Sequence, residues 1–159
     1  MSAPEFASGA ETIALRPLEV GDVGMLRALD EAYAERTGQE TVVDLARLRH
    51  FARSGHAFVA YHEGGTEPLG MVLAHVVWDG ARPVVRGTRL VAWGDDEAVL
   101  ARLLEALVKS AFDAAVYDLM VELPETDRTG QAALRSSGFA PRPLLSFTRV
   151  LGSRGSVTP

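Results

Sequence analysis

The chain has 159 residues, of which 47% are hydrophobic and 23% charged, and this combination is typical of one globular domain with a sizeable core. Its formal net charge of −5 argues against a general nucleic-acid-binding role, because contacts to phosphates require a basic surface. The sequence has no cysteine, which excludes disulfide bonds, thiol nucleophiles and thiolate metal sites, and no apolar run approaches the roughly 20 residues that cross a membrane. We therefore expect a cytoplasmic protein with one domain at residues 12–151 and tails at residues 1–11 and 152–159.

Two amphipathic helices are expected in the first third of the domain. Asp22 is a suitable N-cap for the first helix, and Gly38 marks its end. In the second helix Thr41 and Asp44 resemble a capping box, and Gly55 marks the end. Apolar residues recur at helical spacing in both segments, which predicts that each helix buries one face.

The rest of the domain alternates between β-rich and helical patterns. Three runs rich in β-branched and aromatic residues are separated by the turn-forming segments EGGTEP and DGARP, which predicts an antiparallel meander. A leucine stripe then predicts a helix that ends near Phe112, and a short helix is expected at residues 129–137. The expected strands are residues 12–18, 56–62, 69–78, 84–93, 116–123 and 144–151. The helix between the strands at 84–93 and 116–123 implies a crossover, so these two strands are expected to be parallel neighbours.

This order of elements resembles the GNAT superfamily of N-acetyltransferases. The segment IALRPLEVGDVGMLRAL is similar to the first strand and helix of that superfamily, HAFVAYHEGGTEPLGMVLAHV to its second and third strands, and AALRSSGF to its penultimate helix. The segments FARSGHAF, VKSAFDAAVY and VLGSRG resemble a small uncharacterised bacterial branch of GNAT-like proteins. The resemblance implies an α/β (α+β) fold with a mixed, mostly antiparallel sheet of about six to seven strands. About four helices flank this sheet, which is splayed between its fourth and fifth strands.

The resemblance also implies a site for acetyl-CoA or another acyl-CoA. In this superfamily the pantetheine arm lies along the backbone of the fourth strand, which corresponds here to Leu90, Val91 and Ala92. The pyrophosphate rests on a glycine-rich loop whose N–H groups open the following helix. The residues that align with this loop and carry the expected cofactor contacts are Asp96, Glu97, Ala98 and Val99.

Three consecutive acids, Asp95, Asp96 and Glu97, stand where that loop receives phosphates. A phosphate and a carboxylate about 4 Å apart repel each other by about 1 kcal/mol in water and up to about 4 kcal/mol at an effective dielectric constant of 20. Acids in a first helical turn are also common for another reason, since each one stabilises a helix by about 0.3–1 kcal/mol. We favour this second explanation, in which the protein's own carboxylates occupy the N–H groups. It argues against ordinary CoA binding.

The residues that the resemblance assigns to acid–base chemistry are replaced. Leu134 stands where a tyrosine commonly protonates the departing thiolate, and Arg86 and Arg89 stand on the strand where a glutamate commonly acts as base. The remaining catalytic candidates are Glu122, at the carboxyl end of a strand, and His75, in the middle of one. A single strand histidine is more often structural than catalytic, and a glutamate at a strand end is as often simply solvated.

Aromatic and basic side chains supply the weaker candidates for substrate binding. These are Trp78, Arg89 and Trp93, of which the two tryptophans are alternatively ordinary core residues. Strand alternation places Arg86 and Arg89 on opposite faces unless Gly87 marks a bulge. The four histidines lack the close spacing of metal ligands, so no metal site is expected.

Two functions remain open. The first is an N-acyltransferase that moves an acetyl or other acyl group from acyl-CoA to an amine of a small molecule or a protein. The alternative is a catalytically inactive GNAT-fold module that binds a ligand or a partner. A homodimer is possible in either case, and neither a nucleic acid nor a membrane is expected as partner.

Overall fold

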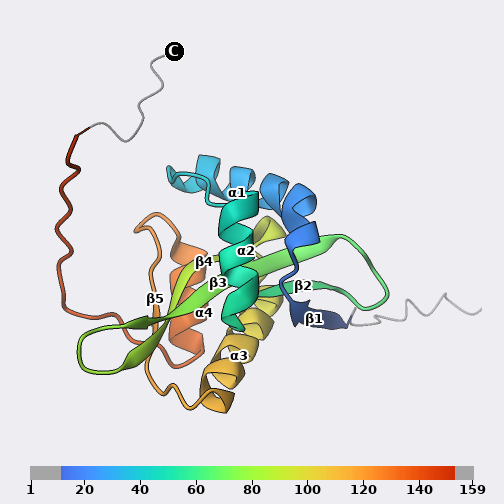
Figure 1. Cartoon of the computed structure of the whole chain (residues 1–159). Helices are drawn as coiled ribbons and strands as arrows, with labels where there is room; N and C mark the ends of the chain where they lie inside the picture. The colour runs from blue at the N-terminus through green and yellow to red at the C-terminus, as the bar shows by residue number, and fades with distance from the viewer. Residues whose placement is uncertain (1–11, 153–159) are drawn as a thin grey trace, which may run out of the picture.

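The computed structural model describes residues 12–152 and contains a mixed sheet with helices on both faces (Figure 1). The expected tails at residues 1–11 and 152–159 therefore lie outside the described residues, except for Gly152. The elements in chain order are β1 (Ile13–Pro17), the 3-10 turn η1 (Val20–Asp22), α1 (Val23–Thr37), α2 (Leu45–Ser54), β2 (Phe58–His62), β3 (Pro68–Trp78), β4 (Pro83–Ala92), the 3-10 turn η2 (Trp93–Asp95), α3 (Glu97–Asp113), β5 (Leu119–Val121) and α4 (Arg128–Ser136). No helix among residues 12–152 is long and apolar enough to span a membrane.

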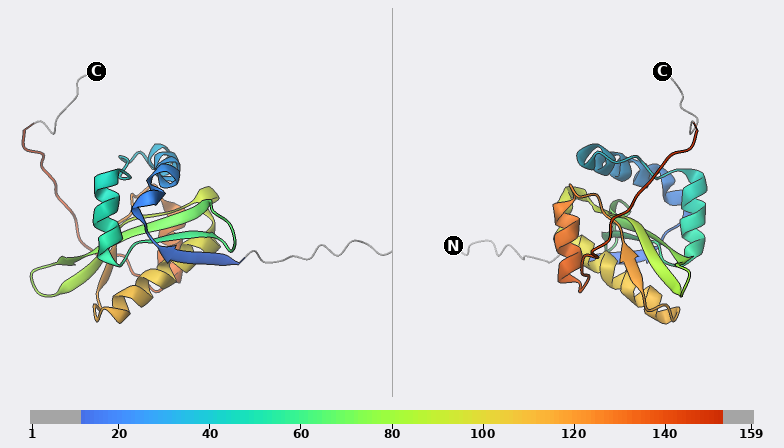
Figure 2. Two further views of the ribbon diagram at one scale, coloured as in Figure 1. Left: turned by 45° about the vertical axis from the view of Figure 1, so that its right-hand side comes forward. Right: turned by 90° about the vertical axis from the view of Figure 1, so that its left-hand side faces the viewer.

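The five strands follow the chain order β1 to β5 across the sheet, and each pair is antiparallel except β4 and β5, which are parallel. Helices α1 and α2 cover one face and α3 and α4 cover the other (Figure 2). Each face has its own buried cluster, built around Leu26, Leu29 and Leu48 on the first and around Leu103 and Leu107 on the second. The expected architecture of parallel β4 and β5 joined by a helical crossover is confirmed.

The leucine stripe that predicted α3 becomes the centre of the second cluster. Leu100, Leu103, Leu104, Leu107 and Ala111 are all buried. Full burial of one leucine side chain stabilises a fold by about 1.5–3 kcal/mol, so this helix anchors its face of the sheet.

The predicted helix ends are mostly confirmed. Gly38 and Gly55 both end their helices in the left-handed conformation, at φ 72° and 77°. Asp44, and not Thr41, is the N-cap of α2, because its carboxylate accepts the N–H of Arg47 at 2.8 Å. At the start of α1 the carboxylate of Asp22 does not cap the helix, because it pairs with Arg16 of β1 and accepts the N–H of Glu19. This arrangement fastens the helix to the sheet.

The sheet opens between β4 and β5, as expected. The two strands pair only from Val85 to Gly87, and β4 then continues to Ala92 without a partner on that side among the described residues. A bulge in β4 makes Thr88 an extra residue opposite β3, so Arg86 pairs with His75 and Arg89 with Leu73. Both arginines therefore lie on the face that α1 and α2 cover.

The strand count differs from the expectation. Among residues 12–152 the sheet has five strands instead of about six to seven, and the predicted strand at residues 144–151 does not form. This segment leaves the end of α4 and extends away from the sheet (Figures 1 and 2). Its sequence favours a strand, but a strand requires a neighbour to pair with.

Candidate functional site

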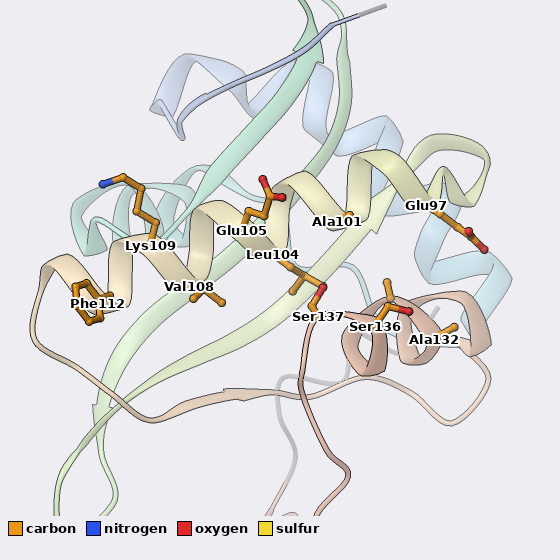
Figure 3. A pocket seen from close by; sticks show the side chains of 11 residues that line it. Glu97, Ala101, Leu104, Glu105, Val108, Lys109, Phe112, Ala132, Ser136 and Ser137 are labelled. Carbon is orange, nitrogen blue, oxygen red and sulfur yellow. The ribbon is translucent and has the colours of Figure 1, made fainter. Parts of the chain in front are cut away.

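A groove of about 740 Å³ runs between α3 and α4 (Figure 3). Its walls combine apolar and small side chains with a few polar ones: Glu97, Ala101, Leu104, Glu105, Val108, Lys109 and Phe112 from α3, and Ala132, Ala133, Ser136 and Ser137 from α4 and its end. Leu104 belongs to the same buried cluster as Leu90 of β4, so the floor of the groove adjoins the opening of the sheet. The groove suits a narrow, mainly apolar ligand with a few hydrogen-bonding groups.

The N-terminus of α3, at one end of the groove, is occupied by the protein itself. The carboxylate of Asp96 accepts the N–H groups of Ala98 at 3.0 Å and Val99 at 3.3 Å. Asp95, held in a left-handed conformation at φ 54°, forms an ion pair with Arg36 of α1 at 2.7 Å. Two N–H groups of the first turn, those of Ala98 and Val99, are thus satisfied by an anionic side chain.

The residues present fit an acyl-CoA only in part. The α3–α4 groove offers apolar walls and two serine hydroxyl groups to a pantetheine-like arm. The turn before α3 offers carboxylates where a pyrophosphate would need free N–H groups. The phosphate end of the molecule therefore has no cradle at α3.

On the opposite face of the sheet, the two catalytic candidates lie near each other, because Arg86 pairs with Glu122 and is the cross-strand neighbour of His75. Glu122 follows β5 at the point where the strands part, and its Oε2 lies 2.7 Å from Nη2 of Arg86. His75 Nδ1 lies 2.7 Å from Nε2 of His50 on α2. Burial, followed by the nearby charges of His50 and Arg86, lowers the pKa of His75 below that of a free imidazole. The structure thus brings Glu122 and His75 into one cluster, with Arg86 between them.

A second polar network is fully buried and links α1, β4 and α4. Nε of Arg89 lies 3.1 Å from Oδ1 of Asp30, its Nη2 donates to the carbonyl of Glu40, and its guanidinium lies 5.0 Å from the ring centroid of Tyr33. Asp30 also accepts two backbone N–H groups from the segment between α1 and α2. The hydroxyl of Tyr33 donates to Asp127 at 2.7 Å, and burial together with this hydrogen bond raises the pKa of Tyr33. Arg89 is therefore committed to internal contacts, and this network was not predicted from the sequence.

Helix α1 contacts the chain that follows both of the parted strands. Arg36 pairs with Asp95 beyond β4, and Tyr33 binds Asp127 beyond β5. The hydroxyl of Thr126 donates to the carbonyl at the end of α1 at 3.0 Å. The carboxyl ends of β4 and β5 are consequently held together on this face by one helix.

The remaining candidates lie apart from these clusters. Leu134 is 9% exposed in the core under α4 and carries no acidic group. Trp78 and Trp93 lie at opposite ends of the β3–β4 hairpin, so they do not wall one pocket. Leu90, Val91 and Ala92 are buried in the part of β4 beyond its last pairing with β5. Among residues 12–152, no group of three or more histidine, aspartate or glutamate side chains is arranged to hold a metal ion.

Comparisons with known proteins identify the family and the fold. The family described as protein of unknown function (DUF1999) matches residues 13–142. The crystal structure of wild-type TTHA1254 from Thermus thermophilus is 38% identical, with a TM-score of 0.73 over 89% of this chain and 99% of that one. A search of curated proteins found no match.

More distant solved structures show the same fold. A ribosomal-protein-alanine N-acetyltransferase from Brucella melitensis is 16% identical, with a TM-score of 0.68 over 89% of this chain and all of that one (100%). An aminoglycoside N-acetyltransferase in complex with CoA is 16% identical, with a TM-score of 0.67 over 87% of this chain and 95% of that one. The GNAT fold implied by the sequence is confirmed, together with the closer likeness to an uncharacterised bacterial branch.

Proposed function

Because this chain belongs to the DUF1999 family and has a GNAT fold, we propose that it is an N-acyltransferase that uses acetyl-CoA or another acyl-CoA. The acceptor is an amine of a small molecule or a protein, and the reaction takes place in the cytoplasm. The observation that carries the proposal is the opening between β4 and β5. It has the α3–α4 groove on one face and Glu122 at its edge on the other.

The two faces of the opening have different roles in the reaction. The thioester supplies an activated acyl carbon; an amide bond forms at that carbon, the C–S bond breaks, and the thiol leaves. An alkyl ammonium group with a pKa near 10.4 has to lose a proton before it can attack. Glu122 supports this step as a carboxylate that attracts the ammonium and accepts a proton, while Arg86 fixes its orientation through the 2.7 Å contact. His75 lies on the same face, has a pKa lowered by burial, and is the second candidate base.

The thiolate has to depart without help from α4, because Leu134 has no proton to give. Its proton comes from solvent or from the ammonium centre that forms when the neutral amine adds to the acyl carbon. A positioned acid or base typically contributes about 10²- to 10⁴-fold, so we expect slow turnover. Leu134→Phe should change the rate little. Leu134→Tyr should raise it if the acyl-CoA occupies the opening.

The test is thiol release from acetyl-CoA against a panel of amines. Because the chain has no cysteine, a thiol reagent reports only the released CoA. We expect Glu122→Gln to lower kcat by about 100-fold or more with unchanged CoA affinity, as loss of a base does. Glu125→Gln, three residues further along the same connection, is the matched control and should retain full activity.

A catalytically inactive binding module is the second candidate function. The capped N-terminus of α3 and the contacts of α1 across the parted strands favour it. No thiol release with any amine, combined with no heat of binding for CoA or acetyl-CoA, would establish this alternative. Release at rates equal for the wild type and Glu122→Gln would remove Glu122 from the proposal but leave the activity.

A further inference from the structure

The segment that follows α4 is apolar, extended and exposed. Phe139 still packs against the core, but the chain then leaves the body of the molecule (Figure 1). Leu145 is 84% exposed, Phe147 89% and Leu151 77%. In an extended chain these three side chains share one side with Arg149, while Ser146 and Thr148 share the other side with Leu144 and Val150. The side with Leu145, Phe147 and Leu151 carries the bulkier apolar side chains, which can cover an apolar surface.

The sheet ends at an edge that can accept such a strand. β5 is the last strand of the sheet, and its side away from β4 has no partner among the described residues. The carbonyl of Asp118 accepts the N–H of Val85, and the N–H of Glu122 donates to Gly87. In a parallel pair, successive residues direct their backbone groups to alternate sides, so Leu119 and Val121 direct theirs to the open edge.

Exposed aromatic side chains lie beside this edge. Phe112, at the end of α3, is 68% exposed, and Tyr117, two residues before β5, is 71% exposed. Their rings meet edge to face at a centroid distance of 6.0 Å. An unpaired edge next to exposed aromatic rings is a surface that soluble proteins normally cover.

We propose that residues 144–151 of one chain pair with β5 of a second copy, so that two copies exchange their C-terminal strands. The segment between α4 and residue 144 favours a second copy over the chain's own β5. Pro141 and Pro143 have fixed φ angles, and each restricts the preceding residue, Ala140 or Arg142, to extended conformations. This stiff connection carries the chain away from its own sheet, as Figure 1 and the left view of Figure 2 show.

The exchange of strands between two copies is symmetric. Each copy offers the open edge of β5 and one free strand, so two copies related by a twofold axis pair both β5 edges in the same way. The paired segment covers the exposed rings of Phe112 and Tyr117 with its own apolar side chains. The partner is thus a second copy of this chain, and the segment that binds is its own C-terminal residues 144–151.

The first test measures mass in solution by light scattering. We expect the full chain to have twice its 17.1 kDa mass at high micromolar concentration, and a chain that ends at Pro143 to have the monomer mass. Phe147→Asp should also be monomeric with an unchanged circular dichroism spectrum, because Phe147 makes few contacts within its own chain. Thr148→Asp, one residue further and on the other side of the strand, is the matched control and should remain a dimer. A monomeric full chain, or a truncated chain that is still dimeric, would overturn the proposal.

The second test separates exchange from pairing within one chain. Because the chain has no cysteine, Asp118→Cys and Ser146→Cys can be combined and joined by a short bis-maleimide reagent. We expect a cross-linked product with the mass of two chains on a denaturing gel, in excess of the two single variants. A cross-linked product with the mass of one chain would show that the segment pairs with its own β5 and would refute the exchange.

Discussion

The carboxylate of Asp96 determines how strongly the start of α3 can bind a phosphate. It accepts the N–H groups of Ala98 and Val99, so it both occupies the donors and adds a negative charge. Asp96→Gly removes both effects, whereas Asp96→Asn removes the charge and keeps a capping side chain. Comparing the two variants therefore separates the repulsion from the occupation of the N–H groups.

The expected gain follows from the geometry of this turn. A carboxylate about 4 Å from a phosphate costs about 1 kcal/mol in water and up to about 4 kcal/mol at an effective dielectric constant of 20. Because Asp96 is exposed, the lower part of this range applies, and relief of about 1–2 kcal/mol corresponds to roughly 5- to 30-fold tighter binding. Loss of the cap should cost only about a few tenths of a kcal/mol of folding stability in Asp96→Gly and little in Asp96→Asn.

The assay is isothermal titration of CoA and acetyl-CoA. We expect weak binding to the wild type, tighter binding to Asp96→Asn and the tightest binding to Asp96→Gly. Asp113→Asn, at the other end of α3, makes the same change in net charge and should bind as the wild type does. A sub-micromolar dissociation constant for the wild type, or equal affinity in all four proteins, would refute the reasoning.

Three further predictions concern the folded state. Arg89→Met should lower the free energy of unfolding in urea by about 3–5 kcal/mol, because it leaves the carboxylate of Asp30 buried without its cation. Adding Asp30→Leu to this variant should restore part of the lost stability. Stability should fall as the pH drops below about 6.5, because burial lowers the pKa of His56 and of His75 in the folded chain. Below that pH the unfolded chain binds more protons than the folded one. His56→Gln should flatten this pH dependence of the free energy of unfolding, measured in urea titrations at several pH values. Gly70→Ala should lower the melting temperature, at a cost of about 1–3 kcal/mol, because the added Cβ would lie 2.6 Å from a backbone carbonyl of β4.

Most of the fold could be predicted because its signals are local. The leucine stripe of α3, the glycines that end α1 and α2 and the turn sequences between strands each act through neighbouring residues. The C-terminal segment shows the limit of this reasoning. Residues 144–151 have the composition of a strand, but whether a strand forms depends on a partner that Pro141 and Pro143 direct it away from.

The candidate site was predicted less completely, because its contacts join distant parts of the sequence. Asp30, Arg89 and Asp127 lie far apart in the chain, and the network among them follows only from the fold. One signal was available in the first helix. Asp30 stands on the apolar side of α1, next to Leu29 and four residues after Leu26, and a carboxylate in such a position requires a buried cation.

The contacts of α1 across the parted strands affect how fast this protein could act as an acyltransferase. The Arg36–Asp95 pair is about two-fifths exposed on each side, and such pairs contribute about 0–1 kcal/mol. The Tyr33–Asp127 hydrogen bond is buried and reaches a carboxylate, so it contributes about 1.5–3 kcal/mol. If the acceptor amine has to displace α1 to reach the opening, breaking both contacts slows the reaction by roughly 10- to 10³-fold. A barrier of that size is compatible with a slow enzyme, so the contacts of α1 do not by themselves require the inactive module, and the thiol-release assay decides between the two.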